Sequence, residues 1–299
     1  MILCSALVAH GANAQVPTEV ALAGIAYSGS DSTVAARFPY SKRYEEEQLA
    51  AGSPIGQQLF RSLTSTPSSQ LRVVPHIDEL KGRTQALAVA LVIGSETVSV
   101  EQIGQHQKLT VLIRGQTMFF DFKSMNVVRA YPISFAYIDV LDHVPQPDEI
   151  MGRVRLVFQG ANGKPGLTSR FVNNVLKAEI PANVPRYLQV TSVKLAPEAL
   201  NALPDYLKSQ PGAAQTWAAD LVSEAISTRA AVPIVPYAKG YAVGNVMSMR
   251  VSDGTVWELK LPKPDYEIAV EISGFKKLKF NEVQGGATSF IYGAYRPRP

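Results

Sequence analysis

The residues from Lys108 to Phe122 alternate between apolar and other side chains, a pattern that strongly limits the local fold. Successive side chains of a strand point to opposite faces, so this alternation predicts a β-strand with one buried face. A turn near Lys123-Ser124 and a second β-prone run, Asn126–Tyr137, follow it, and the run Ala86–Val100 precedes it. We therefore expect an antiparallel meander here. The apolar positions that carry the alternation are Leu109, Val111, Ile113, Met118, Phe120 and Phe122.

The segment before this meander has the pattern of a β-α-β unit. Thr18–Tyr27 is rich in small and branched apolar residues and predicts a buried strand. Ile55–Leu63 carries apolar residues at the spacing of one helix face, and Leu71–Pro75 predicts a short strand. Between them, Ser28–Pro54 is polar and predicts a surface excursion with a short helix near Tyr44–Ala51.

After Pro145 and Pro147 the pattern changes to helices. Two helices are expected at Asp148–Phe158 and Leu167–Ala178, with the loop Gly160–Gly166 between them. Further along, Asp253-Gly254 lies between alternating runs and is a strong hairpin signal. The remaining expected elements are strands at Arg186–Leu195, Val232–Tyr237, Val246–Val251, Val256–Leu261 and Tyr266–Ile272, and helices at Pro197–Leu207 and Thr216–Arg229.

The two halves of the chain follow the same order of elements. Each gives a strand, helical segments, a short strand ending at proline, and then a meander; Val73-Val74-Pro75-His76 corresponds to Ile234-Val235-Pro236-Tyr237. We therefore predict an α+β fold of two similar α/β subdomains, each with a β-α-β opening followed by an antiparallel meander. The expected division is a first domain over residues 15–145, a helical connector over 146–185 and a second domain over 186–299.

The N-terminus predicts export. Ile2–Ala9 is apolar and uncharged, and Ala12-Asn13-Ala14 is the small-x-small pattern of a signal-peptidase site, so residues 1–14 are expected to be a signal peptide. Cleavage before Gln15 would remove Cys4 and leave a mature chain without cysteine. Two alternatives stay open: Cys4 as a lipidated residue, and a plain cytosolic N-terminus. The expected location is the periplasm or cell envelope.

Composition limits the classes of function. The chain has 299 residues, is 46% hydrophobic and 18% charged, and has a formal charge of +4, as expected of a globular protein. The longest apolar run, Ala86–Ile93, is far shorter than the ~20 residues of a spanning helix, so no transmembrane helix is expected in the mature chain. The densest basic group, Lys276, Lys277 and Lys279, alternates with apolar residues and is interpreted as one face of a strand, so no nucleic-acid partner is expected.

The first half, about Thr18 to Asp139, resembles a superfamily of small periplasmic α/β domains. Its members include the amino-terminal domain of the Tol system's propeller protein, the curli-secretion lipoprotein, the outer-membrane activators of peptidoglycan synthases and a flagellar periplasmic ring protein. The residues that carry the resemblance are Val20–Ala26, the helix around Leu59, Val73-Val74, Ala90–Gly94 and Phe119–Phe122. The resemblance implies an adaptor or assembly part of an envelope machine.

Residues that could carry chemistry are few. The histidines of the mature chain, His76, His106 and His143, show no metal-ligand spacing. One group could bind a divalent ion: Asp139, Asp142, His143, Asp148 and Glu149. Alternatively, Asp148 and Glu149 are the cap and first-turn charges of the helix that follows Pro147. We favour the helix-end interpretation and predict no metal site and no cofactor.

Motifs for nucleophilic or phosphate chemistry are weak. Ser273-Gly274-Phe275-Lys276 has the Ser-x-x-Lys spacing, but its flanks alternate like a strand, whereas that chemistry needs a helix. Gly160–Lys164 resembles a phosphate loop, but Pro165 replaces the residue that would hold magnesium. We therefore predict that the protein is not an enzyme. A periplasmic hydrolase acting on glycan or peptide stays as the alternative, since a carboxylate pair needs only spatial proximity.

The expected function is that of an exported, non-catalytic structural or accessory component of a bacterial cell-envelope assembly. Its expected partners are an envelope protein complex or a second copy of the chain, with outer-membrane association as an open alternative. The proposed interaction residues are the β-prone aromatic positions near the C-terminus, Phe290, Ile291, Tyr292 and Tyr295, which are otherwise the last strand of the second sheet. A ligand-binding protein with a pocket lined by Trp217, Tyr237 and Trp257 is a further alternative.

Overall fold

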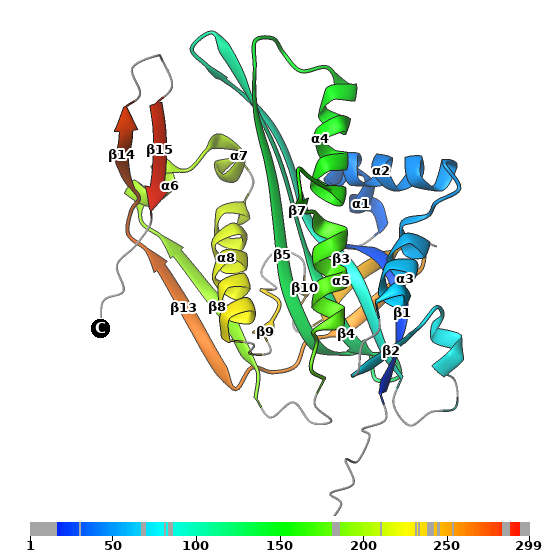
Figure 1. Cartoon of the computed structure of the whole chain (residues 1–299). Coiled ribbons are helices and arrows are strands. Elements are labelled where there is room, and N and C mark those ends of the chain that lie inside the picture. The colour runs from blue at the N-terminus through cyan, green and yellow to red at the C-terminus, as the bar shows by residue number, and fades with distance from the viewer. Residues whose placement is uncertain are drawn as a thin grey trace, which may run out of the picture.

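A computed structural model gives the fold of the chain (Figure 1). It describes residues 17–29, 31–66, 70–80, 82, 86–180, 186–209, 211–230, 232, 234–237, 242–243, 246–252, 254–282 and 288–293. The predicted signal peptide, residues 1–14, lies outside them. The α+β class is confirmed, because an 11-stranded mixed sheet runs through both halves of the chain and helices pack against it. No helix in the described ranges has the length and apolarity needed to cross a bilayer.

The first half has the predicted β-α-β opening and meander. Strand β1 (Thr18–Ser28) runs parallel to β2 (Leu71–Val74) on one edge and to β3 (Leu87–Ile103) on the other. Strands β4 (His106–Asp121) and β5 (Asn126–Leu141) continue the sheet antiparallel to β3. The other elements are α1 (Asp31–Arg37), α2 (Pro39–Ala50), α3 (Ile55–Ser65) and the short 3-10 helix η1 (Ile77–Leu80).

Helix α2 begins earlier than its local sequence predicts. It starts at Pro39, although Phe38 before it provides no side-chain cap. The carboxylate of Glu96, on β3, accepts hydrogen bonds from the backbone N–H groups of Tyr40 and Ser41 at 2.9 and 2.6 Å. Free N–H groups at a helix start need such acceptors. A residue distant in sequence therefore sets the start of this helix.

The connector helices belong to the core of the first half. Helix α4 (Pro147–Gln159) and helix α5 (Leu167–Leu176) are joined by the hairpin of β6 (Gly160–Ala161) and β7 (Lys164–Pro165), where a loop was expected. Phe158 and Phe171 are both 0% exposed, in one cluster with Val89, Leu91 and the helix-facing residues of β4. Figure 1 shows α3, α4 and α5 together on one face of the sheet.

The second half repeats the opening of the first. Strand β8 (Leu188–Leu195) runs parallel to both β9 (Ile234–Val235) and β13 (Tyr266–Ile272), as β1 does to β2 and β3. In both pairs the register shifts once, between Leu22 and Gly24 in the first half and between Ile268 and Ala269 in the second. The intervening helices are α6 (Pro197–Ala202), α7 (Asp205–Lys208) and α8 (Ala213–Ala230).

The end of the second half is divided between two sheets. Strand β14 (Lys276–Glu282) pairs only with β15 (Thr288–Gly293), in a separate two-stranded sheet of the described chain. The predicted hairpin forms as β11 (Val246–Val251) and β12 (Val256–Lys260), with the short β10 (Ala242–Val243) beside it. The sequence predicts that this hairpin extends the sheet of the second half, but the structure does not place it there. It pairs with β1 instead, and its far strand reaches β5 at Asn126.

The β11–β12 hairpin covers the face of the first-half sheet opposite α3–α5. Met247, Met249 and Leu259 are 0–1% exposed and pack with Ala88, Phe120 and other residues of that face. Each apolar side chain removed from water contributes about 1.5–3 kcal/mol, so this burial stabilises the position of the hairpin. The hairpin of the second half thus completes the core of the first.

Candidate functional site

The acidic group considered for metal binding is divided into separate ion pairs. Asp139 pairs with Arg153 at 2.6 Å, and Asp142 with His106 at 2.8 Å. The other contacts are Glu149 with His143 at 3.1 Å and Asp148 with Arg43 at 2.9 Å. Within the residues that the structure describes, no three His, Cys, Asp or Glu side chains gather in a metal-binding arrangement.

The helix-end interpretation is confirmed for the first-turn charges of Asp148 and Glu149, but the expected cap is wrong, since neither residue is the N-cap. Both lie in the first turn of α4, and the Glu149 carboxylate accepts a hydrogen bond from the backbone N–H of Gln146 at 2.9 Å. That bond, with the contact to His143, holds the pKa of Glu149 below its usual value. The N-cap residue itself is Gln146, one residue before Pro147.

The two weak motifs occupy non-helical positions that fit their structural interpretation. Ser273 lies between β13 and β14, and Lys276 begins β14, so this Ser-x-x-Lys string is not on a helix. Gly160–Lys164 forms the β6–β7 turn. The Gly160 backbone has φ +89, and a Cβ there would lie 2.3 Å from the Lys164 carbonyl oxygen, so this glycine allows a close approach of two chain segments.

The aromatic residues expected to line a ligand pocket are divided between two apolar clusters. Trp257 packs against Phe120 and Phe122, with ring centroids 5.4 and 5.5 Å away. Tyr237 is buried in the cluster of α8 with β8, and Trp217 packs against the same cluster, with its ring centroid 6.2 Å from that of Phe275. Trp217 and Tyr237 thus share a cluster, whereas Trp257 belongs to another, so the structure brings together only two of the three expected pocket residues.

Three of the four proposed C-terminal interaction residues lie on β15. Ile291 and Tyr292 are on β15, in register with Leu278 and Lys277 of β14, and Phe290 is opposite Lys279. Their side chains are not described, and Tyr295 lies outside the described residues.

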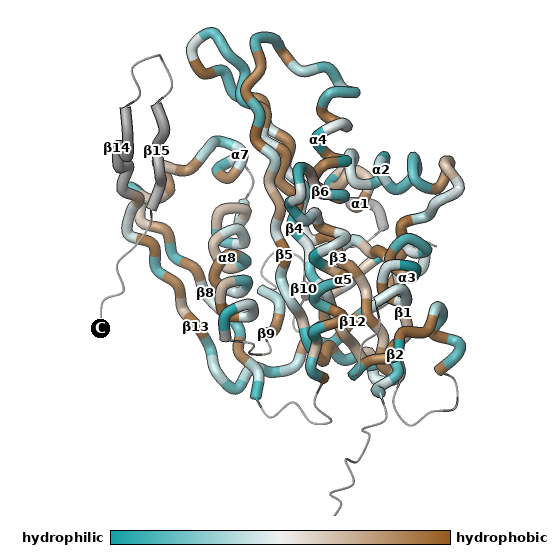
Figure 2. Tube along the Cα trace, viewed as in Figure 1, coloured by the Kyte–Doolittle hydropathy of each residue, from teal (hydrophilic) through white to brown (hydrophobic). Residues whose placement is uncertain are grey.

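The free end of the β3–β4–β5 meander carries exposed apolar side chains. We call this region, residues 99–110 and 136–144, the meander end; Figure 1 shows it extending past the helices that cover the rest of the sheet. Ile103, Ile138, Val140 and Val144 are 53%, 59%, 59% and 62% exposed. Ile138 is opposite Thr110, and Val140 is opposite Lys108. Figure 2 shows brown segments among teal ones at this end of the meander.

The outer edge of β5 has few strand partners, and helix α8 packs against part of this strand. It pairs with β9 at a single position, Ala130, and β12 touches it only at Asn126. From Tyr131 to Leu141 no described strand pairs with this edge. The only β5 side chain in that span hydrogen-bonded to α8 is Ser134, which donates to Glu224 at 2.6 Å. Unpaired strand edges readily accept another strand.

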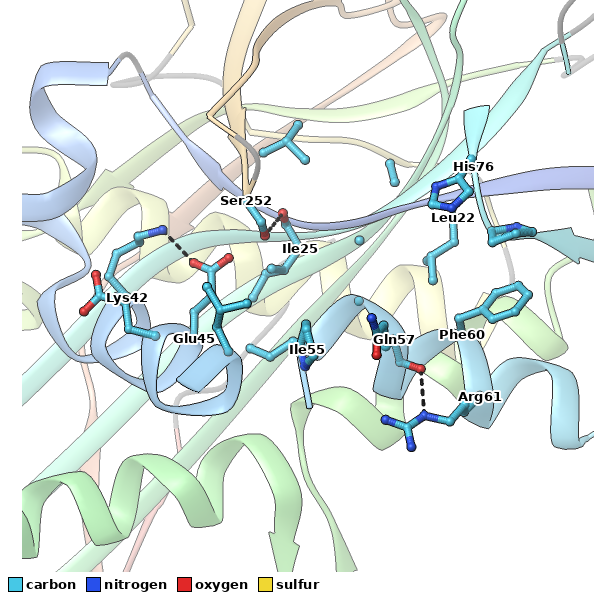
Figure 3. A pocket seen from close by; sticks show the side chains of 18 residues that line it. Leu22, Ile25, Lys42, Glu45, Ile55, Gln57, Phe60, Arg61, His76 and Ser252 are labelled. Carbon is cyan, nitrogen blue, oxygen red and sulfur yellow. Dashed lines mark hydrogen bonds and ion pairs between the residues drawn. The ribbon is translucent and has the colours of Figure 1, made fainter. Parts of the chain in front are cut away.

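A groove of about 750 Å³ lies between β1 and helices α2 and α3 (Figure 3). Apolar side chains line its middle, including Leu22, Ile25, Ile55 and Phe60, and charged side chains stand at its two ends. Lys42, Glu45 and Glu46 are at one end; Arg61 and His76 are at the other. Its volume is typical of sites that bind small ligands or short chain segments.

The charged end at α2 is a fixed network. The Lys42 ammonium contacts a Glu45 carboxylate oxygen at 2.6 Å, and the Tyr27 hydroxyl donates to the same oxygen at 3.0 Å. Burial, followed by the Glu45 charge, raises the pKa of the Tyr27 hydroxyl well above its usual value, so this hydroxyl stays a donor. Glu46, the next residue, is exposed at the rim.

One residue of the sequence, Gly24, indicates this groove. Gly24 lies within a strand of otherwise buried apolar residues, and glycine inside a strand often marks a bulge or a close approach. In the structure Gly24 has φ +79 and lies at the register shift between β1 and β3. Its position opens the floor of the groove.

Comparison with known proteins did not assign the chain to a family. The chain matches no protein-family model and shows no significant similarity to a curated protein.

Proposed function

We propose that the protein is an exported, non-catalytic component or accessory factor of a cell-envelope assembly, acting through protein–protein contacts. The observation that carries this proposal is the meander end, where an open strand edge adjoins exposed Ile138 and Val140. A partner strand added to β5 would form backbone hydrogen bonds and cover these side chains at once. The apolar N-terminus and the resemblance of the first half to periplasmic domains support the location.

The alternative of a hydrolase has less support. In the groove, Glu45 and Glu46 are neighbours on α2, and Glu45 is already paired with Lys42. Glycosidic cleavage uses two carboxylates facing each other across the bond. Successive residues on a helix point in different directions, so this pair does not provide that geometry.

The experiment compares wild-type residues 15–299 with the double variant Ile138→Lys/Val140→Lys. Self-association is measured by size-exclusion chromatography with light scattering, and hetero-association by crosslinking in an envelope fraction followed by titration of the purified partner. Loss of two buried aliphatic contacts, about 1.5–3 kcal/mol each, should weaken the association at least about tenfold. Deleting Phe290–Tyr295 tests the C-terminal interaction residues in the same assays.

The matched control is Val256→Lys, on β12, because Val256 is also exposed at 42% but lies outside the meander end. It should leave association unchanged, and thermal unfolding should show that both variants remain folded. A wild-type protein that stays monomeric and binds no envelope partner would contradict the proposal. So would equal association by the wild type and the double variant.

A further inference from the structure

The edge of β1 that faces the groove is interrupted. On this edge β2 pairs with Thr18–Ala21, and β11 pairs with Ala26–Ser28. Ser252 closes the upper limit, since its N–H and its hydroxyl both donate to the Ile25 carbonyl oxygen at 3.2 and 3.1 Å. Within the described residues, Leu22–Gly24 therefore has no strand partner on this side.

The backbone in this gap offers at least one acceptor. The Thr18 N–H donates to the Gln70 carbonyl oxygen at 2.8 Å, so the backbone groups of Thr18 face β2. Alternate residues of a strand direct their backbone groups to the same edge, so Val20 and then Leu22 face that edge too. Strand β2 ends at Val74, and Pro75 and His76 line the groove instead of pairing further. The Leu22 carbonyl is thus directed toward the groove.

Two glycines, Gly24 and Gly56, leave the floor of the groove without side chains. A Cβ on Gly56, in the first turn of α3, would lie 3.9 Å from the Gly24 Cα, and a Cβ on Gly24 would meet nothing within 4 Å. Phe60 and the 64%-exposed Leu49 form apolar walls around this floor. A chain segment could therefore approach the β1 backbone closely.

The charges at the two ends select the orientation of an occupant. Glu46 is exposed beside the Lys42–Glu45 pair, which gives that end an excess of negative charge. The exposed Arg61 guanidinium and His76 imidazole at the other end favour a carboxylate. An apolar segment with a basic group at one end and an acidic group at the other complements this pattern.

We propose that the groove binds a short, extended, apolar segment of a partner protein, added to β1 at Leu22–Gly24 and carrying a carboxylate that faces Arg61 and His76. The inference rests on the proposed function and names a second contact site within it. The segment's apolar side chain lies between Ile55, Phe60 and Leu49, and its backbone pairs with the open edge of β1.

The probes are two fluorescein-labelled peptides, Lys-Val-Leu-Val-Asp and Asp-Val-Leu-Val-Lys, titrated with the 15–299 protein by fluorescence anisotropy. They carry the acidic residue at opposite ends, because the peptide could pair with β1 in either the parallel or the antiparallel direction. At least one should bind saturably with a Kd below about 1 mM. Methylating the backbone nitrogens of the central Leu and of the Val after it should weaken binding at least about tenfold, because these amides would then lose their hydrogen bonds.

Three variants locate the binding. Gly56→Leu should fill the floor and abolish binding, while circular dichroism checks that α3 remains folded. Arg61→Glu should weaken the acidic peptide about tenfold, and replacing the peptide's Asp by Lys should restore binding to that variant. The matched control, Arg170→Glu on the exposed side of α5, should change binding less than about twofold.

Several outcomes would overturn the inference: no binding by either peptide, unchanged binding by the methylated peptides, or unchanged binding to Gly56→Leu. Ile138→Lys/Val140→Lys separates the two proposals. If this variant loses envelope association but keeps peptide binding, both sites are supported. If peptides fail while wild-type association still depends on the meander end, the groove inference fails alone.

Discussion

The two faces of strand β4 contact helices of opposite character. Leu109, Val111 and Ile113 are 0% exposed and belong to the apolar cluster with α4 and α5. On the other face, Arg114 is directed toward α8 and lies 3.7 Å from the Asp220 carboxylate. Near it, Glu224 of α8 accepts a hydrogen bond from Ser134 of β5. Strand β4 thus contacts the connector helices through apolar side chains and helix α8 of the second half through polar ones.

Helix α8 itself shows why the second contact is polar. Toward its own half it presents Ala218, Ala219 and Val222 to β8. Toward the first half it presents Asp220 and Glu224, and the buried hydroxyls of Ser223 and Ser227 have no hydrogen-bond partner among the described residues. Gln116 and Thr110 of β4 each also hold a buried oxygen without a partner. The apolar side of the helix is used within the second half, which leaves polar groups for the joint between halves.

The two contacts respond to different conditions. Apolar burial depends little on pH, whereas a buried ion pair depends on the charge of each partner and stabilises little in net terms because both charges lose water. The connector helices are therefore firmly part of the first half, and the α8 joint is the element whose stability can be tuned.

The largest effect is expected on the dry side, from Phe158→Ala. Phe158 is 0% exposed and stacks on Tyr44 with ring centroids 4.4 Å apart. Removing a buried ring and leaving a cavity should lower the free energy of unfolding by about 3–5 kcal/mol. Urea denaturation followed by tryptophan fluorescence measures it. A loss below about 1 kcal/mol would contradict the view of a tightly packed dry face.

The second effect concerns the pH response of the polar side. Burial raises the pKa of Asp220 from 3.8 to about 6; the Arg114 charge opposes this shift and the Glu224 charge adds to it. Tyr237 is the other titratable group coupled to Asp220, and its own pKa is raised by burial and by the Asp220 charge. The folded protein therefore binds the Asp220 proton more tightly than the unfolded chain does.

This difference in proton affinity determines how the stability of the folded protein changes with pH. The stabilisation from a protonated Asp220 is complete below a pH of about 4 and is lost as the pH rises through about 6. Between about pH 5 and pH 7, the wild type should lose about 1–2 kcal/mol more than the permanently neutral Asp220→Asn variant. Urea titrations of both proteins at both pH values measure the difference. Parallel pH profiles for the two would show that Asp220 does not titrate in this range.

The smallest expected effect is a gain from Ser227→Ala. Ser227 is 3% exposed on α8, and in the part of the chain that the structure describes its hydroxyl oxygen has no hydrogen-bond partner. Alanine removes that unsatisfied group and has a higher helix propensity, so the variant should be about 0.5–1 kcal/mol more stable. The control is Ser62→Ala on α3, whose hydroxyl is exposed and already bonded to the Gln58 carbonyl oxygen. A destabilised Ser227→Ala would indicate a hydrogen bond at the joint that the static structure does not show.

Much of the fold followed from local patterns. Alternation predicted β4, the β-prone runs on either side of it predicted β3 and β5, helical periodicity predicted α3, and proline and glycine marked the connector helices. The early start of α2 did not follow, because its first N–H groups bond to Glu96, more than fifty residues away in sequence. Candidate sites were harder to predict: the groove combines Gly24 with Arg61 and His76, which no local pattern relates.

The sequence alone determined the type and order of the elements and the repeat of a strand, helices and a proline-ended strand in each half. Those properties depend on side-chain period and turn chemistry, which act between neighbours. The tertiary structure decided that β11–β12 pairs with β1 and not with β13, and that α8 turns its polar side to Arg114. Pairing of strand edges uses backbone groups that nearly every residue carries, so the sequence shows where strands form but not which edge each one joins.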